Sequence, residues 1–334
     1  MKRVSLLSIV FFLLSFAGMT QNALPEYKVK KSVPVEGDGF WDYLIADSVR
    51  HRLFISHGTC VDVLDLKTMK KTGQIPGTTG VHGIALAYEF GKGFVSAGKL
   101  DTVIVFDLKT LAITGRIPVG KNPDAIIYDT VSKRVFAFNA RGNSVTAIDA
   151  ATNEVAGTLS FRSNPEYAVA DGKGGIYVNL ESMSALAKFD AKTLEMITLF
   201  PMGPGKEPTG LAIDRENSRV FSACGESNEL MIIDVEHWDT IAFLPIGWHC
   251  DGDYFLKKTK EVLTSNGEGT ITVFHQDSPN HYRKTQTLVT VKGARTITCD
   301  ESTGLFYLPV ADVKMENEKR VIIPGTFRIL VIGR

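Results

Sequence analysis

Apolar and polar positions alternate in short runs that recur at an almost constant spacing along the chain. One six-residue run, most often ending in Asp, starts again every 40 to 44 residues. Its seven copies span residues 42–47, 82–87, 124–129, 166–171, 209–214, 251–256 and 295–300. Further runs of four to six residues follow the copies, separated by Gly, Asn, Asp and Pro. Because these runs are rich in Val, Ile, Phe and Thr, they indicate strands, and four strands in about 42 residues are typical of a propeller blade.

The repeat predicts an all-β seven-bladed propeller with four antiparallel strands in each blade. The expected blades are 37–77, 78–120, 121–163, 164–206, 207–247, 248–290 and 291–334. The last repeat lacks a fourth strand, and the segment 26–36 supplies it, because its VPVEG sequence matches the IPVG ends of other fourth strands. This pairing would join both ends of the chain and leave no long unpaired edge. We therefore expect residues 21–334 to form one domain.

Residues 1–20 have the pattern of a secretory signal peptide. Lys2 and Arg3 precede an apolar run from Leu6 to Phe16, and small or polar residues follow at 17–20. Crossing a bilayer takes about 20 apolar residues, so this run is too short for a membrane span. We therefore expect a periplasmic or secreted protein with a cleaved signal and no membrane anchor.

The composition excludes some classes of protein. The chain has 37 Lys and Arg against 37 Asp and Glu, so it carries no basic footprint for nucleic acid. Its 4 Cys are too few for a disulfide scaffold in 334 residues and show no C-x-x-C spacing for metal or haem attachment. We expect a monomer that does not bind nucleic acid.

Several segments carry a family resemblance: SHGTCVDVLDLKT, TGVHGIAL, TVIVFDLKTL, NPDAIIYD, KRVFAFN, NPEYAVADGKGGIYVN, EPTGLAID, GARTITCD and IIPGTFRILVIGR. Through them the chain resembles the YVTN-repeat or YncE-like β-propellers, exported bacterial proteins in the broad fold group of quinoprotein amine dehydrogenase heavy chains. The resemblance covers residues 26–334 and implies the fold. It implies no specific activity, because the family is defined by a scaffold.

The same resemblance bears on the cysteines. Family members often have a Cys just before the EP-S/T-G segment that could pair with one at the end of the next strand. This chain has Gly205 at the first place and Cys224 at the second. The other cysteines, Cys60, Cys250 and Cys299, fall in other blades, so we expect no structural disulfide.

Ionisable residues coincide at one level of the predicted channel. The innermost strand of each blade lines the channel, so the first positions of these strands should meet as one ring at its mouth. We name this set the mouth ring: Asp42, His82, Asp124, Glu166, Thr209, Asp251 and Arg295. Four crowded carboxylates focus a negative potential and raise one another's pKa values, which favours capture of a cation. Arg295 could instead hold a ligand carboxylate, or pair with Asp251 or Asp42.

Four further residues are expected near the mouth ring: Trp41, His57, Glu207 and His249. The candidate metal ligands are His82, His57 and His249, although they come from different blades and form no local signature such as H-E-x-x-H. We expect no cofactor, with a divalent metal at the ring as the alternative. An Asp ends the third strand in five repeats, and in four of them a Thr follows three residues later. We interpret these Asp residues as turn caps rather than parts of calcium loops: Asp65, Asp107, Asp149, Asp190 and Asp234.

These features favour an exported, non-catalytic binding or scaffold protein whose channel mouth recognises a small polar ligand, a cation or a protein partner. No nucleophile elbow, haem motif or vicinal Cys pair points to an enzyme. The alternative is a metal-dependent enzyme, or an oxidoreductase-associated subunit, with its site at the same ring. The segment 311–325 departs from the blade spacing and is a candidate lid or partner-contact loop.

Overall fold

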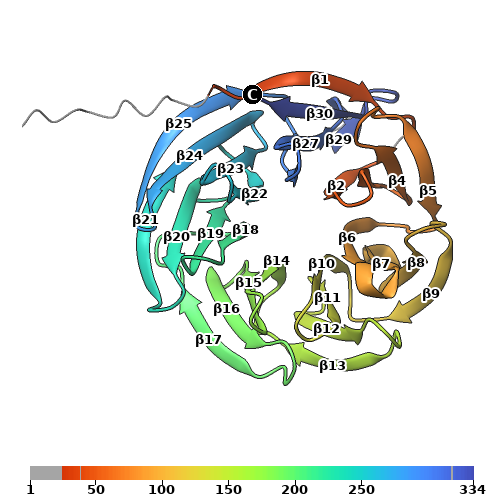
Figure 1. Ribbon diagram of the computed structural model, residues 1–334, viewed down its shortest axis with the longest axis horizontal. Coiled ribbons are helices and arrows are strands. Elements are labelled where there is room, and N and C mark those ends of the chain that lie inside the picture. Colours follow the sequence, from red (N-terminus) through yellow and green to blue (C-terminus); the bar gives the residue numbers. More distant parts are fainter. Residues whose placement is uncertain (1–24, 38, 317–318) are drawn as a thin grey trace, which may run out of the picture.

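The computed structural model describes residues 25–334 except 38, 317 and 318, and it forms a ring of antiparallel sheets around a central channel (Figure 1). Seven of the sheets have four strands each, so the predicted all-β seven-bladed propeller is confirmed. The expected signal peptide, residues 1–20, lies outside the described residues.

In blades 1 to 4 the strands follow chain order from the channel to the rim (Figure 1). Blade 1 contains β2 (Trp41–Asp47), β3 (Arg52–His57), β4 (Cys60–Asp65) and β5 (Lys71–Pro76). Blade 2 contains β6 (Val81–Ala87), β7 (Lys92–Ala97), β8 (Thr102–Asp107) and β9 (Ile113–Pro118). Blade 3 contains β10 (Pro123–Asp129), β11 (Arg134–Asn139), β12 (Ser144–Asp149) and β13 (Val155–Ser160). Blade 4 contains β14 (Pro165–Ala170), β15 (Gly175–Leu180), β16 (Ala185–Asp190) and β17 (Met196–Pro201).

Blades 5 and 6 repeat this order, and blade 7 combines both ends of the chain. Blade 5 contains β18 (Pro208–Asp214), β19 (Arg219–Cys224), β20 (Glu229–Asp234) and β21 (Asp239–Pro245). Blade 6 contains β22 (Cys250–Leu256), β23 (Glu261–Asn266), β24 (Thr270–Ser278) and β25 (His281–Val289). Blade 7 contains β26 (Thr298–Asp300), β27 (Leu305–Val310), β30 (Arg328–Gly333) and β1 (Lys28–Pro34). Because β26 begins only at Thr298, the predicted first residue of this innermost strand, Arg295, lies in the loop before it.

The N-terminal strand closes the ring as predicted. β1 pairs antiparallel with β30, with Ser32 opposite Leu330. Beyond this pair, the Arg334 guanidinium contacts both carboxylate oxygens of Glu261 in blade 6, at 2.6 and 2.7 Å, and lies 3.9 Å from the centre of the Tyr27 ring. Tyr27 and Arg334, near the two ends of the described chain, therefore contact the neighbouring blade as well as each other.

The hydrophobic core lies between neighbouring blades. Phe54 of blade 1 and Phe106 of blade 2 have ring centres 5.7 Å apart, and Phe136 of blade 3 and Phe189 of blade 4 are spaced equally. The second and third strands are covered on both faces by adjacent blades, so consecutive residues are buried, as in β7 and β8. Rim strands such as β17 alternate between exposed and half-buried residues, because one of their faces meets solvent.

The turns between third and fourth strands have side-chain caps. A carboxylate oxygen of Asp65 accepts hydrogen bonds from the main-chain nitrogen of Thr68 at 2.7 Å and from its hydroxyl at 2.8 Å. Asp107 and Thr110 repeat the arrangement in blade 2. The carboxylates are thus engaged by their own turns, which confirms the turn-cap interpretation.

The insertion at 311–325 forms a small hairpin of its own. β28 (Val313–Glu316) pairs antiparallel with β29 (Lys319–Ile322), and an ion pair of 2.7 Å between Asp312 and Arg328 ties its base to β30. Two helices of three residues, η1 (Tyr88–Phe90) and η2 (Gly98–Leu100), occur in blade 2. Within residues 25–334, as far as they are described, no helix has the length and apolar character needed to cross a membrane.

Candidate functional site

Two sets of loops meet on one face of the propeller and frame the channel mouth. Gly98, after the second strand of blade 2, donates its main-chain N–H to the carbonyl of Gly80 in the loop that leads into β6, at 2.8 Å. Gly225 bonds Glu207 in the same way in blade 5, also at 2.8 Å. These bonds fix where each innermost strand starts, and so hold the first residues of these strands at a common level.

Buried polar side chains on the second strands of blades 2, 4 and 6 connect these blades to the next one. The amide of Asn179 on β15 donates to the carbonyl of Thr209 at 3.1 Å, and the hydroxyl of Ser265 on β23 donates to that of Arg295 at 2.5 Å. Because these donors are themselves buried, each bond is protected from water. The main chain at the mouth ring is therefore positioned by the preceding blade.

Three mouth-ring residues from consecutive blades form a compact cluster. The Nδ1 atom of His82 lies 2.6 Å from a carboxylate oxygen of Asp42 and 3.5 Å from one of Asp124. One ligand atom from each residue lies within 4.8 Å of the others, which is close enough for a shared ion. The sequence-predicted metal candidate His82 is thus placed between two carboxylates.

The other side of the ring carries one ion pair and one contact across the channel. Arg295 contacts Asp251 at 2.9 Å, which is one of the two pairings left open by the sequence. Tyr43, one residue beyond Asp42, donates its hydroxyl to Glu166 of blade 4 at 3.3 Å. Arg295 therefore neutralises Asp251, whereas Glu166 has a neutral hydrogen-bond partner.

The surroundings of the mouth ring raise the pKa values of several of its side chains and so favour their protonated forms. Burial and the neighbouring Asp42 charge raise the pKa of Asp124 to about 7, although His82 opposes this shift. Burial and the charges of Asp124 and Asp251 raise the pKa of Glu166 well above its usual range. Burial disfavours the His82 imidazolium, yet the hydrogen bond with Asp42 and the Asp124 charge outweigh it and raise its pKa to about 9. An added cation would relieve this crowding.

Thr209 does not present its hydroxyl to the ring. The hydroxyl donates to the carbonyl of Cys250 at 2.6 Å, and this carbonyl belongs to the start of the next innermost strand. Thr209 therefore acts on the main chain of blade 6 and offers little to a ligand. The mouth ring presents six ionisable side chains rather than seven polar ones.

Of the four further residues expected near the mouth ring, some lie on exposed loops and others in the interior. Glu207 and His249 are exposed on loops that enter β18 and β22. Trp41 lies inside, against Phe327 with ring centres 6.0 Å apart, and its buried indole nitrogen has no hydrogen-bond partner among the described residues.

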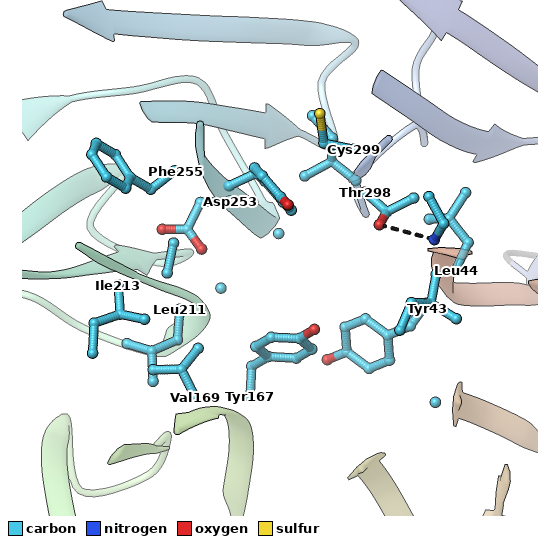
Figure 2. Close-up of a pocket in the computed structure, with 18 of the residues that line it drawn as sticks. Tyr43, Leu44, Tyr167, Val169, Leu211, Ile213, Asp253, Phe255, Thr298 and Cys299 are labelled. Carbon is cyan, nitrogen blue, oxygen red and sulfur yellow. Dashed lines mark hydrogen bonds between the residues drawn. The ribbon is translucent and has the colours of Figure 1, made fainter. Parts of the chain in front are cut away.

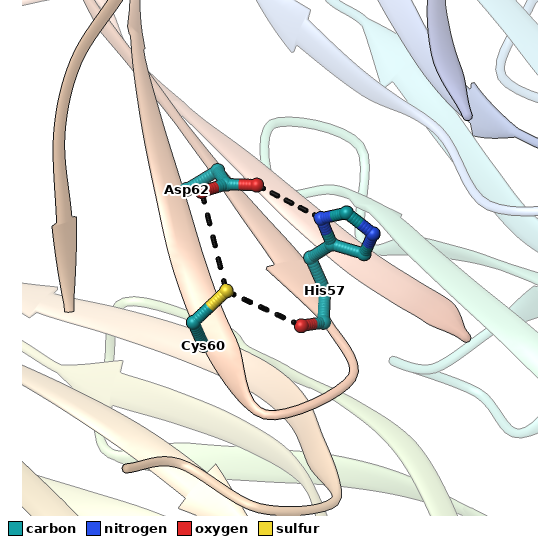
Figure 3. A group of neighbouring side chains, drawn as sticks. All are labelled: His57, Cys60 and Asp62. Carbon is teal, nitrogen blue, oxygen red and sulfur yellow. Dashed lines mark hydrogen bonds and ion pairs between the residues drawn. The ribbon is translucent and has the colours of Figure 1, made fainter. Parts of the chain in front are cut away.

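His57 belongs to a separate cluster inside blade 1, so the structure does not bring it to the mouth ring (Figure 3). Its Nδ1 atom lies 2.9 Å from Asp62, and its ring stacks on Phe327 with centres 4.1 Å apart. Cys60 approaches the same carboxylate, and Lys71 contacts it at 2.6 Å. Because Asp62 already has a cationic partner and His57 is buried, this group stabilises the hairpin between β3 and β4.

A cavity of about 350 Å³ continues from the mouth ring into the channel. Two tyrosines from opposite sides of the propeller, Tyr43 and Tyr167, have ring centres 5.0 Å apart and form part of its wall. At the next level the cavity is lined by the third residues of six of the repeated six-residue runs: Leu44, Ile84, Ile126, Leu211, Asp253 and Ile297. Asp253 is the one polar side chain at this level.

Asp253 was missed by the sequence reasoning. Its side chain is buried, and neither carboxylate oxygen has a hydrogen-bond partner among the described residues. A signal was available, because the equivalent position holds an apolar residue in the other six repeats. These residues are Leu44, Ile84, Ile126, Ala168, Leu211 and Ile297. A single Asp at a repeat position that is otherwise apolar indicates a residue kept for something other than packing.

One family model matches part of the chain in sequence. Residues 85–242 match the YNCE-like beta-propeller family. This YncE-like segment runs from β6 into β21 and contains Asp124, Glu166 and Thr209 of the mouth ring. His82, Asp42, Asp251 and Arg295 lie outside it. No curated protein matches the chain in sequence.

Several solved structures of other proteins share the overall architecture of this chain. The structure of U3-55K has a TM-score of 0.74 at 9% identity and covers 90% of this chain and 97% of that one. The RRP9 WD40 repeats have a TM-score of 0.77 at 9% identity, with coverages of 92% and 100%. Hydrazine synthase of Kuenenia stuttgartiensis has a TM-score of 0.73 at 14% identity, with coverages of 87% and 97%. At these identities the likeness shows the fold alone.

Proposed function

We propose that this protein is an exported binding protein that captures a cationic ligand at the channel mouth. The observation that carries the proposal is the crowding of Asp42, Asp124, Glu166 and Asp251 at one level, against a single Arg295 and His82. Electrostatic focusing in such a low-dielectric opening concentrates cations and repels anions. The same field disfavours a nucleic-acid phosphate backbone. Export is supported by the signal-like pattern of residues 1–20.

Exposed aromatic residues give the mouth an apolar rim. Phe40 is 69% exposed and Trp248 is 63% exposed, and they lie on the loops that lead into β2 and β22. The carbonyls of both residues accept hydrogen bonds from mouth loops, Phe40 from Gly58 and Trp248 from Glu268. Aromatic faces attract cations and also cover apolar groups. This rim supports a ligand that carries both a positive charge and an apolar part.

Cation capture can be tested by calorimetry with a simple dication, 1,4-butanediammonium, and its neutral analogue, 1,4-butanediol. The wild-type protein should bind the dication, and raising the NaCl concentration from about 50 to 500 mM should weaken binding because salt screens the ring. A double substitution, Asp124→Asn with Glu166→Gln, should weaken binding at least tenfold.

The matched control removes two acids from outer turns, Asp107→Asn with Asp149→Asn, and should bind like the wild type. The proposal fails if this control and the mouth-ring variant bind the dication equally well. It also fails if the diol binds as tightly as the dication, because the ring would then not act through charge.

A metal-dependent role is the second candidate, and the Asp42, His82 and Asp124 cluster favours it. Divalent ions take such carboxylate and imidazole ligands, but the His82 nitrogen must first lose its proton. With a pKa of about 9, roughly 1% of His82 is neutral at pH 7. Titration with Mn²⁺, followed by electron paramagnetic resonance at pH 7 and 9, would reveal tighter binding at the higher pH that His82→Gln removes.

A further inference from the structure

The channel cavity below the mouth ring has a lining that specifies one kind of ligand. Its walls combine polar residues with apolar ones, and Leu211, Ile297 and Phe255 are among the apolar residues. Asp253 is one of the acids in this lining, and it is only 7% exposed, with both carboxylate oxygens buried (Figure 2). An isolated buried carboxyl group is costly to the fold, and no Lys, Arg or His contacts it in the described structure.

Glycine at the neighbouring innermost strand makes room for this carboxyl group. A side chain at Gly210 would place its Cβ atom 3.0 Å from Oδ1 of Asp253 and 2.9 Å from its main-chain nitrogen. The Asp253 carboxyl thus occupies space left by Gly210, and it is held there by its own strand. The position of the carboxyl group therefore depends on residues of two adjacent blades, Gly210 in blade 5 and Asp253 in blade 6.

Aromatic rings complete the surroundings. Figure 2 shows the rings of Tyr43 and Tyr167 around the same space as Asp253. The Asp253 charge raises the pKa of the Tyr167 phenol, after burial as the larger cause, so the two groups interact electrostatically. Tyrosine faces attract ammonium groups, and more strongly where water is excluded.

We propose that this cavity binds a small primary alkylammonium ion, with its charged group at Asp253 and its hydrocarbon chain along the apolar wall. This assignment rests on the proposed function, because the mouth ring would select cations before they reach the cavity. The lining includes Asp251 of the mouth ring, so the cavity is continuous with the mouth.

Other ligand classes fit the cavity less well. A metal ion needs several oxygen or nitrogen ligands, and Asp253 is the one acid at its level of the channel. An anion would face the acidic ring on its way in and an unpaired acid at its destination. A volume of about 350 Å³ accommodates a chain of a few carbons. Burial raises the pKa of Asp253 well above its usual range, and a cation bound beside it would lower this pKa again.

The proposal is tested by calorimetry of the full chain with butylammonium and with 1-butanol, which has nearly the same shape without the charge. The wild-type protein should bind butylammonium at least tenfold more tightly than 1-butanol. Asp253→Asn should abolish this preference, because the amide keeps the size and loses the charge. Asp253→Leu, which introduces the residue found at two equivalent positions, provides a second folded variant and should also lose it.

Asp129→Asn is the matched control, because Asp129 is an equally buried acid outside the cavity, and it should retain the preference. The cavity proposal is overturned if Asp253→Asn keeps the preference, or if the wild-type protein binds both molecules alike. If butylammonium fails while 1,4-butanediammonium binds in a mouth-ring-dependent way, cation capture stands and the cavity site falls. If Asp253→Asn removes the preference but the mouth-ring variant changes neither ligand, the cavity site stands and capture at the ring falls.

Discussion

The imidazole of His82 lies 2.6 Å from Asp42 and 3.5 Å from Asp124, and each of the three residues starts a different blade. These three residues lie far apart in the sequence. Their mutual influence arises because seven strands begin at one level around a narrow channel. At the scale of single residues, the propeller therefore acts by bringing charges together and partly excluding water from them.

The raised pKa of His82 predicts a pH-dependent stability. In the unfolded chain its pKa should be about 6.5, against about 9 in the folded protein. The stabilising contribution is fully present below the unfolded value and is lost as the pH rises towards 9. The free energy of unfolding in urea should therefore fall by on the order of 2–3 kcal/mol between pH 6.5 and 9.

His82→Gln should flatten this decline, whereas His249→Gln, which removes an exposed imidazole from the same face, should keep it. An identical slope in wild type and His82→Gln would show that the stability change comes from other groups.

At the scale of elements, the loop that leads into each innermost strand packs against the end of the second strand. Gly205 in the loop before β18 shows how tight this packing is. A Cβ atom at Gly205 would lie 2.9 Å from the Sγ atom of Cys224 at the end of β19. Across a disulfide, the corresponding distance is about 3 Å, set by an S–S bond of about 2.05 Å and a bent C–S bond. All four cysteines of the chain are unpaired, so no existing disulfide competes for Cys224.

Gly205→Cys should therefore form a disulfide with Cys224 under oxidising conditions. Closing a loop of about 20 residues stabilises by about 3 kcal/mol at most, less the cost of moving Met231, whose sulfur also lies 2.9 Å from the new Cβ atom. The oxidised variant should melt at a higher temperature than the same protein after reduction. Gly205→Cys combined with Cys224→Ser should show no such difference, and mass spectrometry that found both thiols free would contradict the prediction.

At the scale of the whole molecule, closure of the ring depends on contacts between the two ends of the chain. The carboxylate of Glu261 in blade 6 accepts hydrogen bonds from Arg334 at 2.6 Å and from the Tyr27 hydroxyl at 2.9 Å. Glu261 is only 2% exposed, so its charge depends on these partners. One buried acid thus links the first and last described parts of the propeller to a third segment of the chain.

Glu261→Gln should destabilise the protein by about 3 kcal/mol, because it leaves the Arg334 guanidinium without its buried counter-charge. Thermal and urea unfolding would measure this loss. Glu216→Gln removes an exposed acid that pairs with Lys257 at 2.9 Å, and it should have little effect. Equal stability of the Glu261→Gln variant and the wild type would show that strand pairing between β1 and β30 closes the ring without this ion pair.

The sequence by itself determined the blade count, the strand order and the N-terminal closure, and it led to the mouth ring as a prediction. These follow from a repeat along the chain, and each copy of a repeat places its first residue at the same level of the fold. The tertiary structure decided which charges pair, as for Arg295 with Asp251, and that Thr209 turns towards the main chain of the next blade. It also placed His57 inside blade 1, and it gave Asp253 an apolar cavity with two tyrosines from opposite blades. Such contacts join residues from different repeats, and they depend on side-chain direction and on the width of the channel, which no single repeat encodes.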